Sequence, residues 1–256
     1  MAVTTKAEGR TLVVTIDRPE SRNAIDGATA TALYETFLSF DTDDNFDSAI
    51  LSGANSTFCS GADLKAAGSG AGNRVHDDVS KPGPLGCTRM LLSKPVVAAV
   101  EGYAVAGGLE LALWCDLRVA ATNTTFGVYC RRWGVPLIDG GTIRLPRLIG
   151  QSRAMDMILT GRGVVGSEAY DWGLANRLVE PGETLSAAIE LAQSLSAFPQ
   201  NCLRSDRLSV HEQWGMDITA ALANETRHGL ATIATGETQA GAQRFAGGAG
   251  RHGEGV

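Results

Sequence analysis

Four short segments, each built on a few Val, Ile, Leu or Ala residues, constrain the fold of this chain more than any other feature. They are residues 11–19, 48–53, 94–102 and 116–121. The first ends in a proline and the third lies between a proline and a glycine, which is typical of buried strands. Between the first two, the spacing of apolar residues predicts a helix over 26–40, with Asp26 as its N-cap. The alternation of strands and helices predicts an α/β fold.

The sequence changes character after about residue 151. Helical patterns follow one another over 151–160, 167–174, 182–198 and from 199 to about 245. We therefore expect a core at 1–195, a helical C-terminal region for oligomerisation at 196–246, and a disordered tail at 247–256. Residues 66–86 are rich in glycine and proline, and we expect a mobile loop or a lid there.

Composition excludes several classes of function. The chain has 256 residues, 44% of them hydrophobic, and a formal net charge of −6, which argues against a nucleic-acid partner. No apolar run approaches the ~18 residues of a membrane span, and the first residues lack the layout of a signal peptide. The five dispersed cysteines indicate free thiols and a cytoplasmic location. The four histidines show no metal-ligand spacing, so we expect no metal.

The stretch GRGVVG at 161–166 matches the glycine pattern of dinucleotide-binding proteins. That pattern has meaning only directly after a strand, and the residues before it are helical in periodicity. We expect a turn here, and a nicotinamide enzyme is the least favoured class of function.

Three segments carry the pattern of a catalytic site. They are residues 58–65, 102–116 and 126–150. In the first two, a strand ends, glycines follow and a helix is predicted to begin, so free backbone N–H groups point outward. Two such turns side by side would form an oxyanion hole, which suits an acyl thioester whose carbonyl becomes an enolate. Glu110, one turn into the second helix, is placed to move a proton beside that hole.

These segments, together with residues 18–33, resemble the crotonase, or enoyl-CoA hydratase/isomerase, superfamily in their order and spacing. The resemblance extends from about residue 11 to 245. It implies an α/β fold built as a spiral of ββα units, with a helical C-terminal region that forms homotrimers, often paired as hexamers. It also implies an acyl-CoA thioester substrate, no separate cofactor, and addition of water to a 2-enoyl-CoA.

The resemblance assigns roles to individual residues. It places the oxyanion-hole donors at the N–H groups of Ala62 and Gly107, and the first catalytic glutamate at Glu110. The segments that hold the adenine and phosphates of CoA contain Arg22, Ala24, Asp63, Leu64 and Lys65. The structural alternatives are a buried glutamate bonded to backbone, packing glycines, and an Arg22 that is simply solvated.

The sequence departs from the family pattern at one position. Cys130 stands where the second catalytic glutamate of a hydratase is expected, and we interpret it as a small apolar filler rather than an acid or nucleophile. Asp139 offers a replacement carboxylate, which could pair with Glu110, or it is the N-cap of the next helix. Double-bond isomerisation, and acyl-CoA binding without turnover, are therefore the alternatives to hydration.

Overall fold

The computed structural model describes residues 2–250. The strands are β1 (Val3–Glu8), β2 (Thr11–Ile16), β3 (Ser48–Gly53), β4 (Val96–Val100), β5 (Tyr103–Val105), β6 (Leu117–Ala121), β7 (Thr125–Gly127), β8 (Gly163–Val165) and β9 (Arg177–Val179). The helices are α1 (Gly27–Thr42), α2 (Leu64–Gly68), α3 (Gly107–Trp114), α4 (Gly141–Ile149), α5 (Gln151–Thr160), α6 (Gly166–Asp171), α7 (Thr184–Ser196), α8 (Gln200–Glu212), α9 (Ile218–Ala234) and α10 (Glu237–Ala246). Short 3₁₀ turns occur at η1 (Pro19–Ser21), η2 (Cys87–Arg89) and η3 (Tyr129–Trp133).

The strands form two sheets. The larger has the order β1-β2-β3-β4-β6-β9, and every pair in it is parallel except β1 with β2. The smaller sheet has the order β5-β7-β8. β4 and β5 are joined by only two residues but belong to different sheets, so the chain passes from one sheet to the other just before α3 begins.

Alternate residues of the central strands serve opposite faces of the large sheet. Val13, Ile50, Val97 and Val119 pack together with two alanines of α7, which covers that face. Their neighbours Val14, Leu51, Ala98 and Ala120 belong to the main core on the other face. Both sets are apolar because a parallel sheet is buried on both sides.

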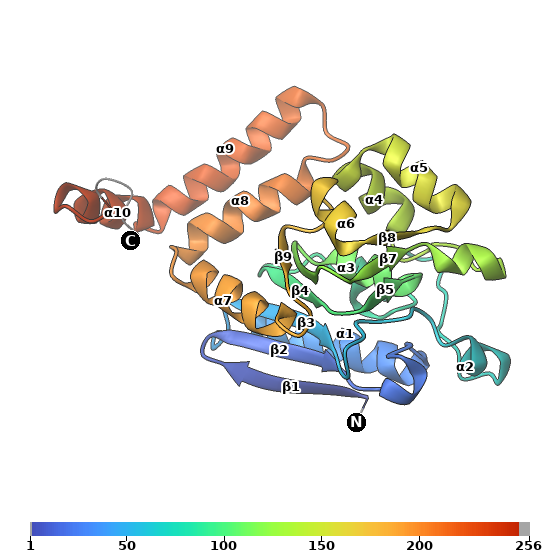
Figure 1. Cartoon of the computed structure of the whole chain (residues 1–256). Helices are drawn as coiled ribbons and strands as arrows, with labels where there is room; N and C mark the ends of the chain where they lie inside the picture. Colours follow the sequence, from blue (N-terminus) through green and yellow to red (C-terminus); the bar gives the residue numbers. More distant parts are fainter. Residues whose placement is uncertain (1, 251–256) are drawn as a thin grey trace.

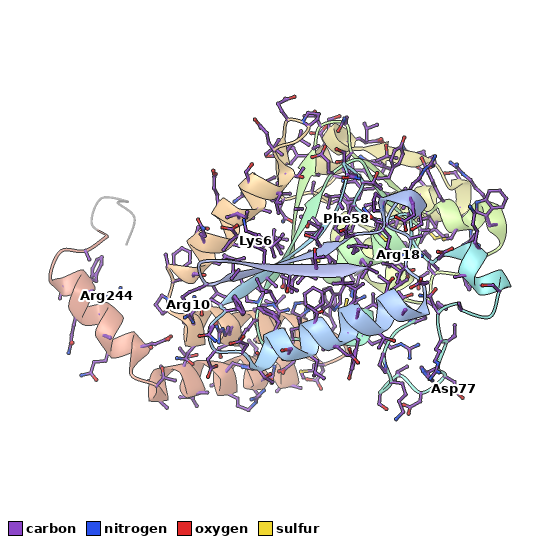
Figure 2. All side chains as sticks on the ribbon, turned by 90° about the horizontal axis from the view of Figure 1, so that it is seen from below. Lys6, Arg10, Arg18, Phe58, Asp77 and Arg244 are labelled. Atoms are coloured by element: carbon purple, nitrogen blue, oxygen red, sulfur yellow. The ribbon has the colours of Figure 1, made fainter. Side chains whose placement is uncertain are left out.

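Of the last three helices, α9 and α10 reach away from the sheets (Figure 1), whereas α8 is joined to the body through the ion pairs Arg204–Asp47 and Arg207–Asp116. α9 packs mainly on α8 and α10, and Arg244 of α10 lies far from β1 and β2 (Figure 2). Many of their large apolar side chains are exposed. The boundary at residue 196 and the oligomerisation role of these helices stay predictions, and residues 251–256 of the expected tail lie outside the described residues.

The expected α/β fold is confirmed. All four predicted strands exist, and the predicted helix is α1, with Asp26 at its N-cap. The expectation of a turn at 161–166 is wrong in part. Residues 163–165 form β8, because they pair with β7 and thereby complete the small sheet.

Within the described residues, no helix is long and apolar enough to cross a membrane.

The N-cap of α1 offers a test of how local capping supports this fold. Asp26 accepts hydrogen bonds from the Thr29 N–H and hydroxyl, and it also pairs with Arg18 at 3.1 Å. Asp26→Ala should lower the free energy of unfolding by about 1 kcal/mol in urea denaturation, because a helix N–H loses its acceptor. Asp26→Asn keeps the cap without the charge and should lose less; equal losses would contradict capping as the cause.

Candidate active site

Glu110 lies in the first turn of α3, just after a strained stretch of backbone. Ala106, the residue before the helix, has a φ of +54°, which is uncommon for a residue with a side chain. Such strained backbone clusters at functional sites and persists when the surroundings hold it. Here β5 and the hydrogen bond from Ala106 N–H to the Gly127 carbonyl hold it. The helix therefore begins beside a cavity, into which Glu110 faces although it is only 2% exposed.

The Glu110 carboxylate is held by the backbone of another segment. Its Oε1 accepts from the N–H of Asp139 at 2.9 Å and of Gly141 at 2.8 Å. Gly141 must be glycine for this contact, because a Cβ there would lie 2.9 Å from Oε1. Oε2 accepts no hydrogen bond from residues 2–250, so one oxygen positions the carboxylate and the other is left for chemistry.

Burial raises the pKa of Glu110 to about 7. The negative charge of Asp139 acts in the same direction as burial, while the two backbone N–H donors and Arg144 act against it, and the value of about 7 is the net result. Loss of water around the carboxylate outweighs the donors. A carboxyl group with a pKa near 7 can both accept and return a proton at neutral pH, which is what a general acid/base requires.

Asp139 lies beside Glu110 and is also buried. Its Oδ1 accepts from the Leu85 N–H at 3.0 Å and from the Thr88 hydroxyl, and burial raises its pKa. The N-cap interpretation of Asp139 is wrong, because Gly140 occupies the cap of α4 and no side chain caps that helix. The structure therefore brings Asp139 to Glu110 rather than to the end of a helix.

The backbones of Ala62 and Gly107 lie close together. A Cβ on Gly107 would be 3.5 Å from the Ala62 nitrogen, and a Cβ on Gly61 would be 2.8 Å from the Gly107 nitrogen. Neither the Ala62 nor the Gly107 N–H donates a hydrogen bond to any residue the structure describes. Two free backbone donors on neighbouring turns are what an oxyanion hole needs.

A cavity of about 640 Å³, which we call the Glu110 cavity, joins these groups. Ala62, Gly107, Glu110, Cys130 and Asp139 all line it. The rest of its wall is mostly apolar, from Leu64, Val75, Leu85, Val105, Tyr129, Trp133, Val135, Pro136 and Ile138. An apolar cavity with a few convergent polar groups is the usual form of a small-molecule site.

Cys130 faces the same cavity from η3. It is 6% exposed, and burial together with the charge of Glu110 raises the pKa of its thiol. A thiol that holds its proton at neutral pH is a poor nucleophile and a poor replacement for a carboxylate. These properties favour the interpretation of Cys130 as an apolar filler.

The residues assigned to CoA lie where two segments meet. A backbone pairing of Ile25 with Ala62 joins residues 22–25 to the turn that holds Ala62. Arg22 and Lys65 are exposed and form no side-chain ion pair within residues 2–250, and Leu64 lines the cavity. Ala24 is buried, and its carbonyl accepts from Arg18.

Asp63 has a structural task. Its carboxylate caps α2 through the Lys65 and Ala66 N–H groups and pairs with Arg18 at 3.1 Å. Arg18 also pairs with Asp26, so one guanidinium fastens the caps of two helices beside Ala62. Arg18 is not among the residues predicted from the sequence, although it opens the segment 18–33 that resembles the family, and that position was the available signal.

Thr88 and Arg144 are also absent from the residues predicted from the sequence. Arg144 donates to the carbonyls of Asp139 at 2.8 Å and Thr88 at 2.7 Å, and it is partly buried behind the two carboxylates. Arg144 lies within the segment 126–150 but nothing in the sequence singles it out there, and Thr88 lies outside all of the segments. The glycine pattern at 161–166 follows α5 rather than a strand, which removes the structural context of a dinucleotide site. Among residues 2–250, no three metal-ligating side chains cluster together.

Comparison with known proteins agrees with this geometry. The profile of the enoyl-CoA hydratase/isomerase family matches residues 6–249. Enoyl-CoA hydratase EchA19 of Mycobacterium tuberculosis is 34% identical over 93% of this chain and 91% of its own length. Carnitinyl-CoA dehydratase of Salmonella arizonae is 42% identical over 73% of this chain and 71% of its own. The crystal structure of enoyl-CoA hydratase EchA1 from Mycobacterium marinum superposes with a TM-score of 0.89, at 35% identity, covering 96% of this chain and 95% of that one. The chain belongs to the enoyl-CoA hydratase/isomerase family, the crotonase family of acyl-CoA enzymes.

The raised pKa of Glu110 predicts how stability depends on pH. Its pKa is about 7 in the folded protein, against an ordinary value of 4.5 that applies to the unfolded chain. The stabilisation by neutral Glu110 is complete below about pH 4.5 and is lost as the pH rises through about 7. The free energy of unfolding of Glu110→Gln, relative to that of the parent, should therefore rise by on the order of 3 kcal/mol between about pH 4.5 and pH 7. Urea denaturation of both proteins at a series of pH values measures the difference; a constant difference would contradict the raised pKa.

Proposed function

We propose that the protein adds water across the double bond of a 2-enoyl-CoA. The observation that carries the proposal is the convergence of two free backbone N–H groups and two buried carboxyl groups on one apolar cavity. The relatives named as hydratase and dehydratase support the same class of reaction.

The thioester oxygen would lie between the N–H groups of Ala62 and Gly107. As water adds to Cβ, negative charge moves to that oxygen and an enolate forms. Donors fixed beforehand at the place where charge develops stabilise the transition state without reorganisation. Ala62 contributes nothing but its backbone to this role, so the close packing of Gly61 against Gly107 sets the geometry.

Two carboxyl groups would then carry two protons. Glu110 takes one proton from the attacking water as the C–O bond to Cβ forms. Asp139, held by Thr88, gives a proton to Cα as the enolate collapses. Glu110 ends protonated and Asp139 ionised, so one proton must return from Glu110 to Asp139 before the next turnover. The raised pKa of both groups suits this exchange at neutral pH.

Arg22 and Lys65 would bind the phosphates of CoA at the mouth of the cavity. Both side chains are exposed cations, and opposite charge at a binding face favours an anionic ligand even on a protein with a net charge of −6. Ala24 and Leu64 would contact the adenine and the pantetheine arm, with Asp63 positioning this segment through Arg18.

Two alternatives use the same site. In double-bond isomerisation, Glu110 removes a proton from the acyl chain and Asp139 returns one elsewhere, without water. The replacement of the second glutamate by Cys130 favours this candidate. A protein that binds acyl-CoA without turnover is the second alternative, which the retention of Glu110 and both free N–H groups opposes.

We also propose that the C-terminal helices join subunits into a trimer or hexamer. Apolar side chains exposed on and between α8, α9 and α10 support this, namely Val210, Trp214, Met216, Ile218, Leu222, Leu230, Ile233 and Phe245. Apolar surface that is this extensive typically marks a protein–protein interface.

Replacement of Glu110 tests the function directly. Wild-type protein should consume crotonyl-CoA or a longer 2-enoyl-CoA, seen as loss of the absorbance of the conjugated thioester. Glu110→Gln should slow this by about 10³-fold while CoA-ester binding is retained, because the proton acceptor is lost and the shape is kept. Unchanged turnover would remove Glu110 from the mechanism. If the wild type binds the ester but leaves the double bond intact, 3-enoyl and dienoyl substrates test isomerisation.

A pair of variants tests which residue replaces the second glutamate. Asp139→Asn should lower the rate by about 100-fold, because the amide keeps the bonds to Leu85 and Thr88 but has no proton to give. Cys130→Ala should change it by less than about threefold, as expected of a filler. An inactive Cys130→Ala beside an active Asp139→Asn would reverse the assignment. Circular dichroism of both variants checks that they fold.

A further inference from the structure

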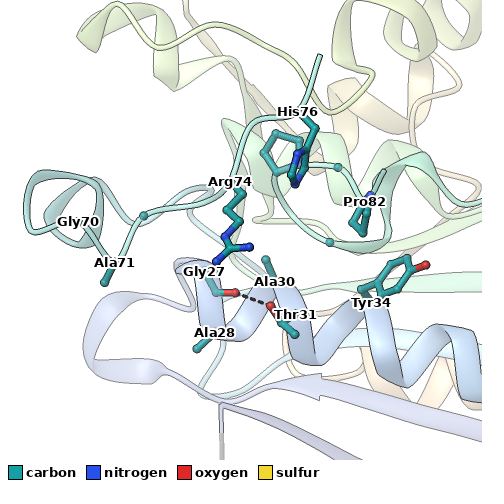
Figure 3. A pocket seen from close by; sticks show the side chains of 14 residues that line it. Gly27, Ala28, Ala30, Thr31, Tyr34, Gly70, Ala71, Arg74, His76 and Pro82 are labelled. Atoms are coloured by element: carbon teal, nitrogen blue, oxygen red, sulfur yellow. Dashed lines mark hydrogen bonds between the residues drawn. The ribbon is translucent and has the colours of Figure 1, made fainter. Parts of the chain in front are cut away.

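A second cavity lies on the far side of the segment that covers the Glu110 cavity. Its volume is also about 640 Å³, and we call it the Arg74 cavity. The first half of α1 forms one wall and the segment 70–86 forms the other (Figure 3). Thr31 and Tyr34 come from α1, and Arg74, His76 and Pro82 from the facing segment. None of the residues assigned above to catalysis or to CoA lines it.

The two cavities share a wall formed by residues 73–76. Asn73 and Val75 line the Glu110 cavity, whereas Arg74 and His76 line the Arg74 cavity. The side chains therefore alternate between the two cavities along residues 73–76, so four consecutive residues serve both cavities. A ligand in the Arg74 cavity would therefore restrain the backbone that carries Asn73 and Val75.

The Arg74 cavity is basic in an acidic protein. Arg74 and His76 line it, and no aspartate or glutamate does. Arg74 forms no hydrogen bond or ion pair with any residue from 2 to 250, and its guanidinium points toward the first turn of α1 (Figure 3). An arginine without a partner at the wall of a cavity offers a planar set of donors that fits a phosphate or carboxylate.

The acidic residues near the Arg74 cavity do not line it. Asp77 lies at the outer side of the segment, where the chain projects from the body (Figure 2). Asp78 accepts from the Ser80 N–H and hydroxyl, although its charge also acts on His76. Asp26 caps α1 and pairs with Arg18. None of them pairs with Arg74.

The wall is fixed from behind by Arg89. This side chain donates to the carbonyls of His76 at 3.0 Å and Asp78 at 3.1 Å. An arginine bonded to two carbonyls of one segment holds that segment in one path and keeps the cavity open.

We propose that the Arg74 cavity binds a small organic anion. A phosphate or carboxylate group would pair with Arg74 and His76. The apolar part of the molecule would pack on Ala28, Ala30 and Pro84. The site is separate from the oxyanion hole, and it reaches the Glu110 cavity through the shared segment 73–76.

Calorimetric titration of the full chain with phenyl phosphate, benzoate and phenol tests the proposal. Phenyl phosphate should bind at least about tenfold more tightly than phenol. Benzoate distinguishes the ligand class: binding like that of phenyl phosphate identifies any anionic oxygen group, and weaker binding identifies phosphate esters. Both results support an anion site; no preference for either anion over phenol overturns it.

Matched variants locate the binding. Arg74→Gln should remove the preference for the anion. Lys81→Gln removes the same charge from the same segment, but Lys81 does not line the cavity, so this variant should bind as the wild type does. Equal loss in both variants, or in neither, would contradict the assigned site.

Hydrogen exchange provides a second measurement that does not depend on turnover. Phenyl phosphate should slow amide exchange in residues 70–76 of the wild type and of Lys81→Gln, but not of Arg74→Gln. Protection confined to the turns at Ala62 and Gly107 would mean that the probe occupies the Glu110 cavity, and would overturn the proposal. Neither experiment uses enoyl-CoA, so failure of the proposed anion site is distinguishable from failure of the proposed hydration.

Discussion

Two hydrogen bonds from one turn to one carboxylate oxygen hold this site together. The N–H groups of Asp139 and Gly141 both donate to Glu110 Oε1. An unpartnered carboxylate in a buried position costs several kcal/mol, so α3 and the turn before α4 must pack together for Glu110 to be tolerated. The same turn carries the Asp139 side chain. The contact that makes Glu110 acceptable in an apolar helix therefore also delivers the second carboxylate.

The position of Arg144 explains why these carboxylates remain available. Arg144 binds the carbonyls of Asp139 and Thr88 and not the carboxylate oxygens. A direct ion pair would hold a carboxylate ionised and would occupy the atoms that must exchange protons. Because Arg144 binds the neighbouring carbonyls instead, its positive charge lowers the pKa of Glu110 by less than burial raises it. The Glu110 pKa thus stays near 7 instead of falling to the range of a paired glutamate.

The parts of the fold that the sequence predicts are those with a local cause. Residues 48–53 have an apolar centre and end in glycine, and they form β3 with the same bounds; Asp26 caps α1 because its neighbours favour a helix. The three-residue strands β5, β7 and β8 could not be predicted, since partners distant in sequence create them. The role of Thr88 could not be predicted for the same reason, because its hydroxyl bonds to Asp139, which lies 51 positions away in the sequence. Asp139 shows the limit of a local rule: aspartate favours an N-cap, but Gly140 takes that place and frees the side chain for the cavity.

The charges in the Glu110 cavity explain why a neutral residue suits position 130. The charge of Asp139 already raises the cost of ionising Glu110. A glutamate at position 130 would add a third carboxylate to one apolar cavity and raise the pKa of Glu110 further. The buried thiol stays neutral and avoids that repulsion. On the proposed mechanism, the site keeps two working carboxyl groups and moves the second from η3 to the turn before α4. The replacement at Cys130 and the buried carboxylate at Asp139 are then two aspects of a single arrangement.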